Sequence, residues 1–136
     1  MTTSLLLRIA SIISLLFAAG HTLGGRHDWS PAGETDVLHA MRTVRFEVLG
    51  VSRTYLDFYR GFGFTLSVYM LLQAVVLWQL ASLARSEPSR VRGMVASFAV
   101  ASVAVGLLSW KFIFPLPVVF SAVLAVCLVI AFLTAR

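Results

Sequence analysis

Residues 61–84 read GFGFTLSVYMLLQAVVLWQLASLA, and this stretch contains no charged side chain. A helix needs roughly 20 predominantly apolar residues to cross the hydrocarbon core of a membrane. The stretch is continuously apolar and does not alternate, which is typical of a membrane helix and not of a barrel strand. It therefore predicts that lipid surrounds a large part of this chain.

The composition of the whole chain supports the same interpretation. Hydrophobic residues make up 59% and charged residues 12% of the 136 residues, whereas soluble domains contain about 45–50% and about 25% respectively. A chain of this length has room for one domain, and small soluble domains bury the smallest fraction of their surface. The excess of apolar residues indicates an integral membrane protein.

Three further apolar segments have the length of a membrane helix. Together with the first stretch, the predicted spans are residues 4–23, 61–84, 93–110 and 115–135. The short connections between the last three spans predict antiparallel neighbours. The expected fold is therefore all-α, an up-down four-helix transmembrane bundle that forms a single domain over residues 1–136. The first span also has the parts of a secretory signal, whose cleavage is the alternative to a retained helix.

The long connection at residues 24–60 is the main polar region, and a helix is expected within it. Thr35 can cap that helix through its hydroxyl, and Asp36 would lie in the first turn, where the helix dipole favours a negative charge. One apolar stripe then follows at helical spacing, made of Val37, Met41, Val44, Val48 and Val51. This pattern predicts an amphipathic helix that lies on the membrane surface or packs on the end of the bundle.

The formal net charge of +5 does not indicate a nucleic-acid partner. The arginines lie beside the apolar segments, where they orient helices and meet lipid head groups. The compact basic connection RSEPSRVR, residues 85–92, favours cytoplasmic termini. We therefore expect a multi-pass protein of a bacterial inner membrane. Its expected partners are membrane lipids, a lipophilic ligand, or another copy or partner membrane protein.

Cysteine and histidine usage argues against metal and redox chemistry. Cys127 is the sole cysteine, so the chain contains neither an internal disulfide nor a CxxC motif. His21, His27 and His39 lack the spacing of zinc ligands. No metal and no cofactor is expected.

Small residues on the first and third spans predict where helices approach closely. Ser11, Ser14, Ala18 and His21 share one face of the first span, so His21 is expected to point into the bundle or its mouth. A second stripe of small residues on the third span consists of Gly93, Ser97, Ala101 and Ala104.

In an up-down bundle, the end of the first span meets the start of the second and the end of the third, and polar residues gather there. The predicted binding residues are His21, Glu47, Tyr55, Asp57, Tyr59, Arg60, Tyr69, Gln73, Trp110 and Lys111. Within SRTYLDFYRGFGF, residues 52–64, Asp57 lies at helical spacing from Arg53 and Arg60. The structural alternative is an aromatic belt with a self-neutralising ion cluster that anchors the second span.

The segments GHTLGG, residues 20–25, and YLDFYRGFG, residues 55–63, resemble features of small bacterial four-helix membrane proteins of unknown function. The layout is also similar to that of emopamil-binding and sterol-isomerase-like membrane proteins. That resemblance implies acid/base chemistry on a lipophilic substrate, for which His21 and Asp57 would be the counterparts.

Three functions follow from these patterns. The first is binding of a lipid, a small amphiphile or a partner subunit at the polar mouth. The alternative is a membrane-embedded enzyme that uses His21 and Asp57 as acid and base, which requires both groups within reach of one substrate. A small-molecule transporter is a third alternative, although the first span carries no acidic residue.

Overall fold

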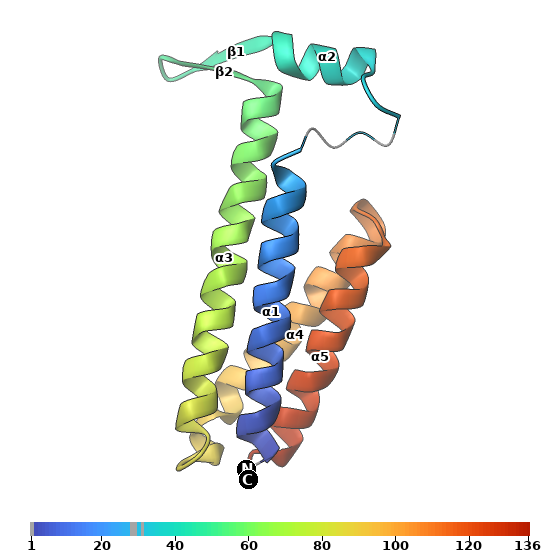
Figure 1. Cartoon of the computed structure of the whole chain (residues 1–136). Helices are drawn as coiled ribbons and strands as arrows, with labels where there is room; N and C mark the ends of the chain where they lie inside the picture. The colour runs from blue at the N-terminus through green and yellow to red at the C-terminus, as the bar shows by residue number, and fades with distance from the viewer. Residues whose placement is uncertain (1, 28–29, 31) are drawn as a thin grey trace. The chain divides into compact units, whose positions relative to one another are not determined.

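The computed structural model describes residues 2–27, 30 and 32–136, and in these the chain forms five helices and a two-stranded sheet (Figure 1). In chain order the elements are α1 (Thr2–Gly25), α2 (Asp36–Thr43), β1 (Arg45–Val48), β2 (Val51–Thr54), α3 (Tyr55–Leu83), α4 (Pro88–Phe112) and α5 (Pro115–Thr134). The described residues are thus mostly helical, as predicted, whereas the sheet is not predicted by the sequence. Residues 28, 29 and 31 of the long polar connection lie outside the described residues.

Four helices in the described part of the chain, α1, α3, α4 and α5, are long and apolar enough to cross a membrane. Their exposed surfaces carry large apolar side chains such as Leu16, Val68 and Leu107. Lipid tails are as apolar as leucine, so such side chains need not be buried in protein. These are the helices of a multi-pass membrane protein, as predicted.

The helices extend beyond the apolar spans. α3 begins at Tyr55 and α4 begins at Pro88, whereas hydropathy predicts starts at residues 61 and 93. Hydropathy locates the apolar core of a helix, while its end is set by capping and by the first turn. α5 has proline in its first positions, where the N–H that proline lacks would be unpaired in any case.

Contacts divide the chain into two compact units. The first unit comprises Met1–Phe17 and Met70–Arg136, and the second comprises Ala18–Tyr69. The core of the first unit draws apolar side chains from all four long helices, including Leu7 and Ala10, Leu77 and Leu80, Val91 and Val95, and Leu124 and Leu128. This packing buries apolar surface mainly through small and branched side chains.

Hydroxyl groups of α1 bond the backbone of α3 within the first unit. The Ser4 hydroxyl donates to the carbonyl oxygen of Ala81 at 2.6 Å, and the Ser11 hydroxyl donates to that of Ala74 at 2.6 Å. The partner numbers fall on α3 as they rise on α1, so the two segments are antiparallel.

The third hydrogen bond between α1 and α3 is made by the side-chain amide of Gln73, which lies near the middle of the predicted span 61–84. Gln73 donates from Nε2 to the Ser14 hydroxyl at 3.1 Å. Gln73, a predicted binding residue, thus bonds a neighbouring helix. We call Ser4, Ser11, Ser14 and Gln73 the polar seam.

The predicted inward face of α1 is confirmed. Ser11 and Ala18 are each 5% exposed and Ser14 is 2% exposed, while His21 is half-buried. Small side chains allow close approach and leave room for hydrogen bonds between helices. The seam thus follows from the serine spacing of α1.

The interpretation of the small stripe on α4 is wrong. Its members, Gly93, Ser97, Ala101 and Ala104, are exposed, and the buried residues of α4 are Val91, Val95, Ala99, Ser102 and Ser109. The adjacent face packs instead, and it combines two valines with alanine and serine. α4 comes close to α5 at Gly106, where an added Cβ would lie 3.4 Å from the Cβ of Ser121.

In the second unit, α2 begins as predicted. The Thr35 hydroxyl accepts a hydrogen bond from the Leu38 N–H at 3.2 Å, and Asp36 lies in the first turn. The helix dipole favours the negative charge of Asp36 in the first turn, and the Thr35 hydroxyl satisfies a backbone donor, so both stabilise the start of α2.

The predicted continuation of this helix to Val51 is wrong. α2 ends at Thr43, and an antiparallel hairpin of β1 and β2 follows, with Val48 paired to Val51. β-Branched residues favour strands, and Gly50 inside a helix would cost about 1 kcal/mol relative to alanine. Gly50 instead adopts a positive φ of 77° in the hairpin turn, which glycine permits without strain. The valine spacing fits both structures, and turn geometry decides between them.

The polar seam is testable by a double-mutant cycle. Gln73→Leu and Ser14→Ala are expected to show a coupling of about 0.6 kcal/mol in the free energy of unfolding, a typical value for a hydrogen bond between membrane helices. The measurement is unfolding of the detergent-solubilised protein by SDS titration. Gln79→Leu, an exposed glutamine of the same helix, is the matched control and should not couple to Ser14→Ala. Zero coupling for Gln73 would contradict the bond.

Candidate functional site

The start of α3 is fixed by a reciprocal pair of hydrogen bonds. The Asp57 N–H donates to the Thr54 hydroxyl at 3.1 Å, and the Thr54 N–H donates to Oδ2 of Asp57 at 3.0 Å. This arrangement is a capping box, which satisfies two otherwise unpaired backbone donors. The Asp57 carboxylate therefore caps α3, a structural role different from the ion cluster with Arg53 and Arg60 that the sequence suggested.

Beyond this cap, four residues of α3 lie on one face of the helix. Leu56, Arg60, Gly63 and Ser67 follow one another at steps of four, three and four residues, so they lie on one side. Leu56 and Ser67 are buried, and Arg60 and Gly63 are half-buried. This face of α3 carries both polar features described next.

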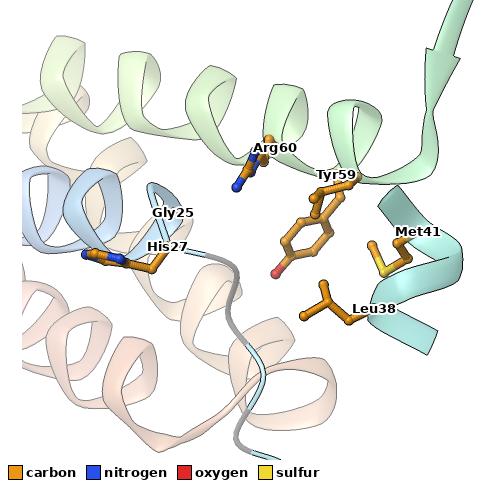
Figure 2. A pocket seen from close by; sticks show the side chains of 7 residues that line it. Gly25, His27, Leu38, Met41, Tyr59 and Arg60 are labelled. Carbon is orange, nitrogen blue, oxygen red and sulfur yellow. The ribbon is translucent and has the colours of Figure 1, made fainter. Parts of the chain in front are cut away.

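A cavity of about 220 Å³ lies in the second unit, where α2, α3 and the end of α1 supply its walls. Its lining residues are Gly25, His27, Leu38, Met41, Leu56, Tyr59 and Arg60. In Figure 2, Tyr59 and Arg60 project from α3 toward the space beside α2, and Leu38 and Met41 extend from α2. One part of the wall is thus apolar, and another carries the phenol of Tyr59 and the guanidinium of Arg60.

A wider hollow of about 490 Å³ adjoins the same turn of α3 and is open at the surface. It is lined by Arg53, Asp57, Arg60, Gly61 and Phe64. Arg60 lines both hollows, so its guanidinium is the cationic group common to them. Guanidinium offers five N–H donors in a planar fork, which suits carboxylate and phosphate groups.

His21 is engaged further along the same face. Its Nδ1 lies 3.0 Å from the Ser67 hydroxyl, and that hydroxyl donates to the Gly63 carbonyl oxygen at 3.3 Å. A hydroxyl has one proton, which Ser67 directs to Gly63, so His21 Nδ1 is the donor to Ser67.

The structure does not bring His21 and Asp57 together. A Cβ added at Gly63 would lie 3.9 Å from Cε1 of His21, so His21 is level with Gly63. Gly63 is six residues beyond Asp57, about 9 Å along a helix axis. That separation exceeds hydrogen-bond reach to one substrate atom.

Other predicted site residues of the second unit have separate surroundings. Glu47 is exposed in β1, opposite Ser52 of β2. The Tyr55 ring packs 5.1 Å from the ring of Phe46. Tyr69 is exposed on α3. Of the predicted binding residues, Tyr59 and Arg60 are the pair that the cavity brings together.

Three predicted site residues belong to the first unit. Gln73 is part of the polar seam. Trp110 is exposed near the end of α4, and the Lys111 ammonium lies 5.0 Å from the centroid of the Phe112 ring. The contact of Lys111 fits a snorkelling anchor at the end of a membrane helix.

The cavity also contains residues that sequence reasoning missed, namely Gly25, His27, Leu38, Met41 and Leu56. Met41 belonged to the predicted apolar stripe of this helix, but Leu38 did not, and Val37, the first member of that stripe, is 71% exposed. Nothing in the sequence indicated that this stripe would face Tyr59.

Arg8 of α1 is a second feature that the sequence did not distinguish from an ordinary flanking charge. Its guanidinium carbon lies 5.1 Å from the centroid of the Trp78 ring, a cation–π distance. Its Nε is buried and has no hydrogen-bond partner among the described residues. The tryptophan face therefore compensates part of the cost of holding this charge within an apolar helix.

No group of three or more His, Cys, Asp and Glu side chains within residues 2–27, 30 and 32–136 could hold a metal ion. Comparison of the chain with protein-family models, with curated proteins and with solved structures gave no match. Any functional interpretation therefore depends on the geometry of the described residues.

The capping box makes a prediction about α3. Thr54→Val removes the hydroxyl, and the first turn should lose about 1 kcal/mol of stability, which corresponds to roughly fivefold faster amide exchange in that turn. Hydrogen exchange followed by mass spectrometry measures the effect. Thr54→Ser keeps the hydroxyl and should retain the protection. Equal exchange in the valine and serine variants would contradict the cap.

Proposed function

We propose that this chain is a multi-pass membrane protein that binds an amphiphile with an anionic head group in the cavity beside Tyr59 and Arg60. The observation that carries the proposal is the division of the cavity wall. Leu38, Met41 and Leu56 form an apolar side, whereas Tyr59 and Arg60 provide polar groups. An amphiphile has the same division within one molecule.

The size of the cavity favours a head group with a short length of chain. Its volume of about 220 Å³ is below the roughly 300–1,000 Å³ of pockets that enclose drug-sized ligands. A complete lipid would therefore have to leave its tails outside the cavity. The Arg60 guanidinium and the Tyr59 hydroxyl would donate to head-group oxygens, and the apolar side would contact the first methylene groups.

The membrane arrangement that accompanies this proposal is an up-down bundle. Within the first unit, the antiparallel bonds of α1 to α3 and the close approach of Gly106 to Ser121 support it. The same bonds support retention of α1, because Ser4 and Ser11 have partners that a cleaved signal would not need. We further propose that α2 lies at the membrane surface of a bacterial inner membrane, with both termini in the cytoplasm.

The proposal is tested with two amphiphiles of the same chain length, dodecyl phosphate and dodecylphosphocholine, whose binding is measured by native mass spectrometry of the purified protein. Dodecyl phosphate should bind more tightly. Arg60→Gln should weaken its binding roughly tenfold to a hundredfold, because a hydrogen bond to a charged group contributes about 1.5–3 kcal/mol. Arg85→Gln, an exposed arginine outside the second unit, is the matched control and should leave the affinity unchanged.

A cavity-filling variant separates this site from nonspecific detergent binding. Met41→Trp should abolish saturable binding of dodecyl phosphate, because the larger ring occupies the space that the head group would fill. Val37→Trp places the same ring on the exposed side of α2 and should bind like the unmodified protein. Retained elution volume and helical circular dichroism establish that each variant is folded. Equal binding by both tryptophan variants would overturn the proposal.

A further inference from the structure

The hairpin of β1 and β2 has two chemically different faces. Residues paired directly across an antiparallel hairpin lie on the same face, and successive residues alternate. The pairs Val48 with Val51 and Phe46 with Arg53 therefore share one face. The other face carries Arg45, Glu47, Ser52 and Thr54. We call the first the apolar face of the hairpin.

This apolar face is exposed. Val48 is 57% and Val51 is 47% exposed, so the protein in the described residues covers neither of them fully. Phe46 is half-buried, because its ring lies 5.1 Å from Tyr55 and 5.6 Å from Phe58.

The apolar face continues onto the surface of α3. Phe58 lies 4.9 Å from Phe62, edge to face, and both rings are exposed. Phe46, Phe58 and Phe62 thus form one row of rings that connects the hairpin with the outer surface of a helix apolar enough to cross a membrane. The apolar surface of α3 therefore continues onto the hairpin, where Arg53 is the charged residue of the same face.

The tip of the hairpin is unusual for a structure in water. Leu49 has a positive φ of 53°, followed by Gly50 at 77°, as a two-residue turn of the hairpin type requires. Asparagine, aspartate or glycine normally occupies such a position, and a leucine there is strained. Leu49 is also 98% exposed, so burial among the described residues does not explain its apolar side chain.

The orientation of the hairpin fits the surface of a bilayer. In Figure 1 the two strands run across the N-terminal end of α3 and not along its axis. When α3 crosses a membrane, such a hairpin lies along the interface between head groups and acyl chains. Arg53 is on the apolar face, where its Nη1 donates to the Ser52 carbonyl oxygen at 2.8 Å. Its aliphatic stem can remain among lipid, and the other N–H groups of its guanidinium can reach a phosphate.

We propose that the hairpin is a membrane-inserted element that contacts the phospholipid layer entered by α3. Val48, Leu49 and Val51 enter the upper acyl-chain region, and Arg53 pairs with lipid phosphate. This contact would hold the second unit at the membrane surface, whether or not its cavity binds an amphiphile. The occupant is the bilayer itself, because the apolar face is continuous with a lipid-facing helix and carries a cation suited to phosphate.

The test is site-directed spin labelling of the whole chain in vesicles of phosphatidylcholine and phosphatidylglycerol. Nitroxides are attached to cysteines at Val48, Val51, Glu47 and Ser52, each in a Cys127→Ala background. Collision with oxygen reports lipid exposure, and collision with a water-soluble nickel chelate reports water exposure. The oxygen-to-nickel ratio should be severalfold higher at Val48 and Val51 than at their neighbours Glu47 and Ser52.

Two results would overturn the proposal. Equal and high nickel accessibility at all four positions would mean that the hairpin is in water. Low accessibility to both reagents at Val48 and Val51 would mean that protein covers the apolar face.

A second variant tests the tip alone. Leu49→Asn suits the left-handed conformation better than leucine, so the hairpin remains folded while its apolar tip is lost. The oxygen-to-nickel ratio at Val48 and Val51 should then fall severalfold. An unchanged ratio would overturn the assignment of Leu49 to the membrane contact.

Discussion

The second unit depends on the two hydrogen bonds between Thr54 and Asp57 that begin α3. A helix start leaves backbone N–H groups unpaired, and near lipid such groups have little access to water. By satisfying two donors at this point, the cap allows the helix to begin immediately after β2. The rotation of α3 about its own axis is thereby linked to the hairpin.

Because of this rotation, adjacent side chains of α3 face two different surroundings. Phe58 and Phe62 occupy the side of α3 that continues from the hairpin. Tyr59 and Arg60 are one and two residues after Phe58 and line the cavity. Successive helical residues point about 100° apart, so a lipid-contacting surface and a polar cavity can share two turns of one helix.

In the first unit, the constraint is the choice of partner and register between helices. In lipid, apolar contact alone gives helices little preference for one partner or register. The serines of α1 provide that preference by bonding α3 carbonyl groups at Ala74 and Ala81. Each bond contributes little, but a shifted register would lose these bonds between the two helices. The apolar packing of Leu7 and Leu77 then follows from a register that polar atoms select.

The sequence by itself determined the four apolar helices, the cap at Thr35 and the inward face of Ser11, Ser14 and Ala18. These features depend on local composition or on spacing along one helix. Tertiary structure decided the rest. The valine pattern from Val44 to Val51 fits helical spacing, yet the left-handed turn at Leu49 and Gly50 makes it a hairpin. The cavity required α2 to meet α3, so Tyr59 and Arg60 could be predicted as polar residues but their partners Leu38 and Met41 could not. Periodicity reports which residues share a face of one element, whereas the choice of what that face meets depends on contacts between residues distant in the chain.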